Sequence, residues 1–197
     1  MHARLRPLPA SLRLSFALFL LLPLPAALLL QAAAPAPATG PGPTVDRVGF
    51  PVDYQKTFQP LRTFNRAKPR NLITVYANPT AAAVADSGDL PYPHGSVFVM
   101  EFAEVPTGPD GQPLFDAQGR FQKGRVTSLH VMRHGEKFGE AYGPLRTGEW
   151  EYVEYRPDGS TLTAPKDSFT CAACHLQAGA SRDWVYRGRF EAPETMK

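Results

Sequence analysis

Residues 149–156 read Glu-Trp-Glu-Tyr-Val-Glu-Tyr-Arg, and residues 157–159, Pro-Asp-Gly, follow them directly. Apolar and charged side chains alternate along this stretch, which is the pattern of a half-buried β-strand. An Asp-Gly pair favours a tight turn between antiparallel strands. The stretch therefore predicts a strand that ends in a hairpin turn.

Three other segments are rich in the β-branched and aromatic residues that strands favour, namely residues 71–76, 96–104 and 126–133. Strong turn signals separate the strands, among them Pro109-Asp110-Gly111 and Gly119. The order of strands and turns predicts a small antiparallel sheet.

Helix signals are fewer. Asn78-Pro79 provides a helix cap followed by proline at the first helical position. A second helix is expected to begin near Asp167 or Ser168 and to stop at Gly179, and a third over Tyr54 to Arg66. The fold class expected is α+β and β-dominated, with an antiparallel sheet and a few short helices.

The N-terminal part of the chain has the composition of a targeting segment. Residues 1–34 combine three arginines, an apolar run over Leu14 to Leu30 and three alanines, which predicts a signal peptide or, if it is retained, an N-terminal anchor. Residues 35–44 form a Pro/Ala/Gly linker, and residues 45–197 are the expected folded domain. The expected location is therefore periplasmic or otherwise extracytoplasmic, and a membrane is a partner only if the segment is retained.

The formal net charge of +3 comes from this N-terminal segment. Residues 1–44 hold three arginines and no acidic residue, so the rest of the chain has 18 basic and 18 acidic residues. A neutral domain lacks the basic surface that binds the phosphates of nucleic acid. No nucleic-acid partner is expected.

The two cysteines of the chain lie in Cys171-Ala172-Ala173-Cys174-His175, a C-x-x-C-H motif. This motif is typical of c-type haem attachment, in which each thiol binds one porphyrin vinyl group and the histidine ligates the iron. Cysteines three residues apart on a helix face the same way. The expected cofactor is one covalent haem c, held by Cys171 and Cys174, with His175 as the metal ligand.

Three other interpretations of the cysteines stay open. A thiol–disulfide redox pair belongs to a βαβ context that the order of strands does not predict. A zinc site needs two further ligands, for which His130 and His134 are candidates. A structural disulfide makes the adjacent histidine a coincidence.

The chain resembles the cytochrome P-460 and cytochrome c′-beta family of exported monohaem proteins. The matching motifs are spread over residues 50–190: Phe50-Pro51-x-Asp53-Tyr54, Thr74-Val75-Tyr76-x-Asn78-Pro79, Gly95 to Glu101, Trp150, the C-x-x-C-H motif and Asp183-x-Val185-Tyr186. The resemblance implies a sheet-dominated domain, often a homodimer, with the haem packed against one face of the sheet and a C-terminal helix carrying the cysteines.

One position departs from the P-460 branch. In that branch a lysine on the Gly-Ser-Val strand is linked to a porphyrin meso carbon and the protein oxidises hydroxylamine, whereas Met100 occupies the matching position here. A thioether cannot form the bond that an amine forms. The lysine-free c′-beta branch has an apolar distal pocket that binds nitric oxide, so the resemblance implies such a pocket near Met100.

Side-chain alternation agrees with this implication, because Phe98, Met100 and Phe102 share one face of their strand. A water-poor surface of this kind over an open iron favours a small neutral ligand such as NO. His130 is a further distal candidate, as a proton donor, and it shares a face with Met132 and His134.

Three functions therefore stay open. The first is a haem protein that binds a small diatomic or nitrogenous ligand at a five-coordinate iron. The second is an oxidoreductase of hydroxylamine or NO, so the enzyme assignment is uncertain. The third is an electron-transfer cytochrome with a sixth protein ligand, Met100 or a histidine, working with a redox partner protein that the sequence does not identify.

Overall fold

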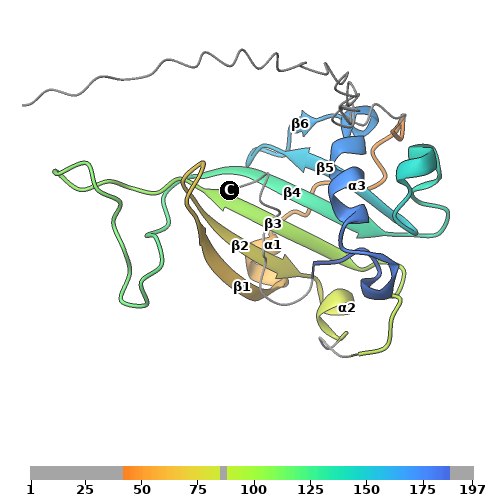
Figure 1. The fold of residues 1–197 in the computed structure, drawn as a ribbon, viewed down its shortest axis with the longest axis horizontal. Helices are drawn as coiled ribbons and strands as arrows, with labels where there is room; N and C mark the ends of the chain where they lie inside the picture. The colour runs from red at the N-terminus through yellow and green to blue at the C-terminus, as the bar shows by residue number, and fades with distance from the viewer. Residues whose placement is uncertain (1–41, 85–87, 187–197) are drawn as a thin grey trace, which may run out of the picture. The chain divides into compact units, whose positions relative to one another are not determined.

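The computed structural model describes residues 42–84 and 88–186 (Figure 1). The predicted signal peptide, residues 1–34, lies outside the described residues, and so does most of the predicted linker at 35–44. No helix in the described part of the chain is long and apolar enough to span a membrane.

The described chain is built on a six-stranded antiparallel sheet in which every strand pairs with its neighbour in sequence. This arrangement confirms the predicted β-dominated α+β fold. The strands are β1 (Gln59–Arg66), β2 (Asn71–Ala77), β3 (Val97–Ala103), β4 (Val126–His134), β5 (Trp150–Tyr155) and β6 (Thr161–Thr163).

The helices are short, as predicted. They are α1 (Tyr54–Thr57), α2 (Pro79–Ala82), α3 (Phe169–Leu176) and the 3₁₀ turns η1 (Glu140–Leu145), η2 (Pro165–Asp167) and η3 (Ala180–Arg182). Two of them lie close to where the sequence predicts them: α2 starts after its cap Asn78, and α3 carries both cysteines but ends at Leu176, before the predicted stop at Gly179. Gly179, three residues beyond α3, has a φ of 81°.

The predicted helix over Tyr54 to Arg66 is wrong beyond Thr57. Only its first turn is helical, and Gln59–Arg66 forms β1. Pro60 cannot supply the amide of a helix interior, but it is tolerated in an edge strand. Strand β1 pairs with β2 alone, and a register shift lies between Pro60 and Arg62.

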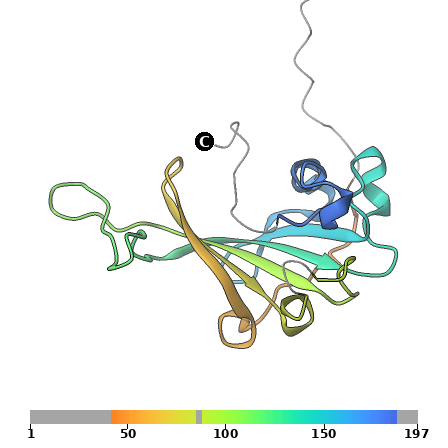
Figure 2. The ribbon, with the colours of Figure 1, turned by 60° about the horizontal axis from the view of Figure 1, so that its bottom comes forward.

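The sheet separates two hydrophobic clusters because side chains alternate along each strand. One face carries Phe98, Met132 and Tyr152 and is covered by Ala172 of α3. The opposite face includes Tyr54 of α1, together with Val99, Leu129, Val131 and Val153. Figure 2 shows α3 on one side of the curved sheet, with the β1–β2 turn rising on the same side.

Asn78 joins α2 to the sheet. Its side-chain oxygen accepts hydrogen bonds from the backbone amides of Ala81 and Val97, each at 3.0 Å, and its amide donates to the Gly95 carbonyl at 2.8 Å. Asn78→Ala is expected to lower the free energy of unfolding by about 2 to 3 kcal/mol, since it removes a helix cap and leaves a strand amide without its partner. Denaturant unfolding measures this change.

Thr80→Ala is the matched control, because Thr80 lies exposed in the same helix. We expect it to change the free energy of unfolding by less than about 0.5 kcal/mol. Equal effects of the two substitutions would show that the Asn78 cap does not support the sheet.

Candidate functional site

Helix α3 presents Cys171, Cys174 and His175 beside strand β5. Both thiols are free and half-buried. The Sγ atom of Cys171 lies 3.9 Å from a carboxylate oxygen of Glu154, and that of Cys174 lies 3.8 Å from the Tyr186 hydroxyl. The two thiols therefore sit one helical turn apart at the edge of the sheet face that α3 covers.

His175 is held in one orientation by the segment after α3. Its Nδ1 lies 2.7 Å from the Trp184 carbonyl oxygen, and because a carbonyl only accepts, Nδ1 carries the proton. The ring packs on Tyr152 with centroids 4.7 Å apart and meets the edge of Tyr186. Burial lowers the pKa of His175 to about 4, so the ring is neutral and keeps Nε2 as a metal-binding lone pair.

The strand register places Met100 in the middle of the face that α3 covers. Val75 of β2, Met100 of β3, His130 of β4 and Glu154 of β5 are successive cross-strand partners. Met100 is half-buried and packs against the cluster that includes Ala172 of α3. Met100 and His130 therefore lie on the same face of the sheet, and it is the face that α3 covers.

Phe98 and Phe102 flank Met100 on the same strand and face. Phe98 is buried and packs edge-on against Tyr92. The Phe102 ring is 4.3 Å from the His130 ring, and the Arg66 guanidinium lies 4.8 Å above it. Phe98, Met100 and Phe102 therefore form an apolar stripe along one face of β3, with a phenylalanine at each end and Met100 between them.

His130 forms a pair with Glu154. Its Nδ1 is 3.2 Å from a Glu154 carboxylate oxygen. Burial lowers the pKa of His130, the Glu154 charge opposes this shift, and Arg66 adds to it. The pair places one proton-carrying group at the edge of the apolar stripe.

Sequence reasoning missed the parts of the site that β1 and β5 supply. Tyr152 and Glu154 were read only as strand residues, although both contact the C-x-x-C-H helix. Arg62 donates a hydrogen bond to the Tyr186 carbonyl at 2.9 Å and lies beside Phe64. This contact was not predicted because residues 54–66 were expected to form a helix, whereas Arg62 lies in β1.

The other interpretations of the cysteines fit poorly. Burial raises the pKa of Cys171 to about 12 and also raises that of Cys174, whereas a redox pair needs a thiol of lowered pKa. Among residues 42–84 and 88–186, the group of His, Cys, Asp and Glu side chains close enough to hold a metal ion contains neither cysteine.

Two free thiols on one helical turn, a neutral imidazole with one free nitrogen and an apolar sheet face fit a haem. These features define the class of cytochromes. The model of the cytochrome P460 family matches residues 51–187, so the chain belongs to that family and is a haem-binding cytochrome. A search of curated proteins finds no match to the chain.

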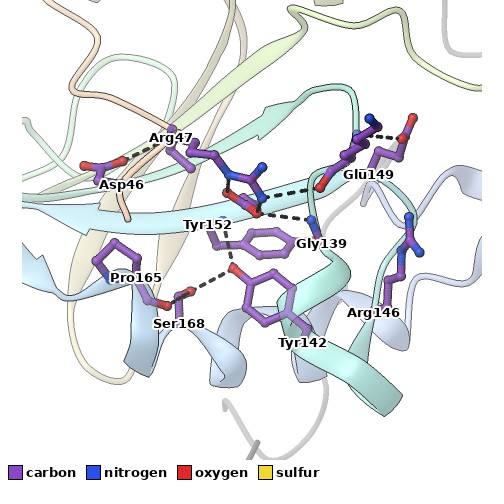
Figure 3. Close-up of polar contacts among 12 residues, drawn as sticks. Asp46, Arg47, Gly139, Tyr142, Arg146, Glu149, Tyr152, Pro165 and Ser168 are labelled. Atoms are coloured by element: carbon purple, nitrogen blue, oxygen red, sulfur yellow. Dashed lines mark hydrogen bonds and ion pairs between the residues drawn. The ribbon is translucent and has the colours of Figure 1, made fainter. Parts of the chain in front are cut away.

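Tyr142 of η1 fastens α3 to the sheet. Its fully buried hydroxyl lies 2.8 Å from Ser168 Oγ, at the start of α3, and accepts a hydrogen bond from the Tyr152 amide (Figure 3). Tyr142→Phe leaves that amide unpaired, so we expect the free energy of unfolding to fall by about 1 to 3 kcal/mol. Thermal or denaturant unfolding of the haem-loaded protein measures the loss.

Thr147→Val is a comparison at a neighbouring position, because among the described residues the hydrogen-bond partner of the Thr147 hydroxyl is the Tyr152 hydroxyl of β5, at 2.8 Å, and not a residue of α3. Both substitutions remove a buried hydrogen bond, but only Tyr142→Phe is expected to increase hydrogen exchange in the amides of α3. Equal exchange in the two variants contradicts the fastening role.

Proposed function

We propose that this cytochrome carries one haem c, attached by thioether bonds from Cys171 and Cys174, with His175 as the axial iron ligand. We further propose that the other side of the haem faces an apolar pocket for a small neutral ligand such as NO. The observation that carries the proposal is the His175 Nδ1–Trp184 carbonyl hydrogen bond of 2.7 Å, which leaves Nε2 as the free ligand atom.

The environment of His175 supports its role as a ligand. An imidazole that ligates a metal normally donates its other nitrogen to a carbonyl or carboxylate, which fixes the ring and raises its basicity. The backbone carbonyl of Trp184 serves here, and Tyr152 packs on the ring. His175 is thus oriented by the protein independently of the iron.

The thiols support covalent attachment. Cys171 and Cys174 are unpaired, lie three residues apart on α3 and flank the sheet face that carries Val75 and Met100. Burial holds both thiols in the neutral form, and neutral thiols are what addition across two vinyl groups consumes. The bound haem supplies an iron that binds small ligands and exchanges one electron.

The character of the stripe supports a small neutral ligand. Phe98 and Met100 offer no charge, and Phe64 from β1 packs against the same cluster. A surface of this kind does not replace the hydration of an anion. It therefore selects diatomic ligands over charged ones.

The export of the protein is part of the proposal. Residues 1–34 would direct the chain to the periplasm or another extracytoplasmic compartment, where haem c is attached. A retained segment would anchor the same domain to the membrane.

The absorption spectrum of the ferrous protein, before and after adding CO or NO, tests the proposal. A high-spin spectrum that shifts on adding either gas is expected. A low-spin spectrum that does not respond to CO would contradict it and favour an electron carrier. Turnover of hydroxylamine would favour the oxidoreductase, for which the His130–Glu154 pair at 3.2 Å is the supporting observation.

Met100→Leu separates a pocket residue from an iron ligand. Leucine keeps the volume and the apolar character of the side chain but has no sulfur to bind iron. We expect the ferrous spectrum to be unchanged and affinity for CO to change by less than about tenfold, which is about 1.4 kcal/mol. Met132→Leu is the control, because Met132 lies opposite Phe98 on the neighbouring strand β4.

A further inference from the structure

A second group of possible metal ligands lies in an open cleft of about 430 Å³ at the end of β4, whose lining also includes Asp183 and Trp184 of the segment after α3. His94, His134 and Glu149 line this cleft, and one ligand atom from each lies within 4.8 Å of the others. No further group of this kind occurs in the part of the chain that the structure describes. None of the three residues contacts Cys171, Cys174 or His175 in the haem site proposed above.

The sheet register brings these residues together from distant parts of the chain. The Gly95 amide donates to the His134 carbonyl at 2.8 Å, which sets His94 beside the end of β4. The Gly135 amide donates to the Glu149 carbonyl at 3.0 Å, which brings Glu149 to the same edge. The cluster is therefore built on strand pairing and not on a loose surface contact.

His134 is the member that points to a ligand. The residue is only 5% exposed, and its Nδ1 has no hydrogen-bond partner among the described residues. Its ring packs on Trp150, with centroids 4.8 Å apart, and on His94, with centroids 5.0 Å apart. Buried polar atoms are nearly always paired, so an unpaired imidazole nitrogen beside a second imidazole needs an explanation.

Two carboxylates line the cleft, those of Glu149 and Asp183. A Glu149 carboxylate oxygen lies 2.7 Å from His94 Nε2, and the other oxygen accepts the Lys137 amide at 2.9 Å. Asp183 also lines the cleft; it is buried and accepts the Tyr92 amide at 2.8 Å. Two carboxylates beside two imidazoles favour a cation.

We propose that His94, His134 and Glu149 bind a divalent transition-metal ion of the Zn²⁺ class. Two imidazoles and one carboxylate at an open cleft are a common set of three protein ligands for zinc, and they leave a fourth position for water. Tetrahedral ligands about 2.0 Å from an ion lie about 3.3 Å apart. The His94–Glu149 pair therefore has to widen slightly and separations of up to 4.8 Å have to shorten, which the half-exposed His94 side chain permits.

Calorimetric titration of Zn²⁺ into the haem-loaded, chelator-treated protein at neutral pH tests the site. One Zn²⁺ per chain is expected, with affinity reduced at least about tenfold in His94→Ala and in Glu149→Gln. His94 and Glu149 are only partly buried, so these variants are expected to fold, whereas His134→Ala also opens a cavity. Loaded haem keeps His175 and both cysteines from competing for the ion.

Glu136→Gln is the matched control, because Glu136 is an exposed acid in the same loop after β4 and lines no part of the cleft. We expect it to keep the affinity of the unmodified chain. No zinc binding by the unmodified protein, or binding that is unchanged in His94→Ala and Glu149→Gln, would overturn the proposal. Neither result bears on haem attachment, which does not use these residues.

Discussion

A chain with both cysteines replaced, Cys171→Ser and Cys174→Ser, is expected to lose all of its haem on extraction with acidified organic solvent. Only a covalent bond holds a porphyrin to an unfolded chain, and the two thiols are the only ones in the sequence. The unmodified protein should keep all of its haem through the same treatment. The pyridine haemochrome spectrum of the protein fraction measures what remains.

Replacing only one of the two cysteines tests each thioether bond separately. Each single variant retains one thioether, so haem should stay attached, with a haemochrome spectrum displaced by the one remaining vinyl group. Ala173→Ser, on the same helical turn, is the matched control and should match the unmodified protein. Haem that survives extraction in the double variant would show that another residue attaches it.

Replacing His175 with glycine is expected to change the absorption spectrum of the haem strongly. The haem should remain attached through Cys171 and Cys174, while the spectrum of an imidazole-ligated iron is lost completely. Imidazole added to the solution should restore that spectrum, because removal of the ring leaves space beside Tyr152 and Tyr186. Absorption spectra with and without imidazole make the measurement.

His94→Ala is the control for the loss of a histidine, since His94 lies in the separate cleft near β4. Its spectrum should be that of the unmodified protein. An unchanged spectrum in His175→Gly would refute the assignment of the iron ligand.

The pH dependence of stability follows from the same residue. Burial lowers the pKa of His175 to about 4, while an unfolded chain has a histidine pKa of about 6.5. Between these values the unfolded chain binds the proton and the folded chain does not, so the haem-free protein loses stability as the pH falls from about 6.5 to about 4. His175→Gln is expected to reduce this slope, with His130 and His134, whose pKa values burial also lowers, supplying the part that remains, as denaturant unfolding at several pH values would show.

Much of the fold could be predicted because the residue types of the central strands are those expected of buried strands. Strands β2, β3, β4 and β5 are bounded by turn residues and carry the β-branched and aromatic residues that a two-sided core needs. The edges could not be predicted in this way. Strand β1 has no fully buried residue and contains Pro60, and β6 has three residues, so neither carries a clear period.

In the site, too, some features could be predicted from the sequence and others could not. Cys171, Cys174 and His175 are contiguous, so a motif of five residues was enough to predict their chemistry. The contacts of Glu154 with Cys171 and of Tyr152 with His175 join α3 to β5 and depend on how the helix lies on the sheet. A single sequence carries no signal for such long-range contacts.

The cluster at the end of β4 was missed for a related reason. His134 was predicted only as a member of a strand face and as a candidate zinc ligand for the cysteines, and only the strand register sets it beside His94 and Glu149. The predicted signal peptide and linker, the homodimer and the small ligand stay predictions.

Mass spectrometry of the mature polypeptide shows directly whether a haem is attached to Cys171 and Cys174. We expect an intact mass increased by one haem, and a proteolytic peptide spanning Cys171 to His175 that carries the whole addition. A polypeptide with no added mass, made in cells whose other exported cytochromes mature normally, would contradict it.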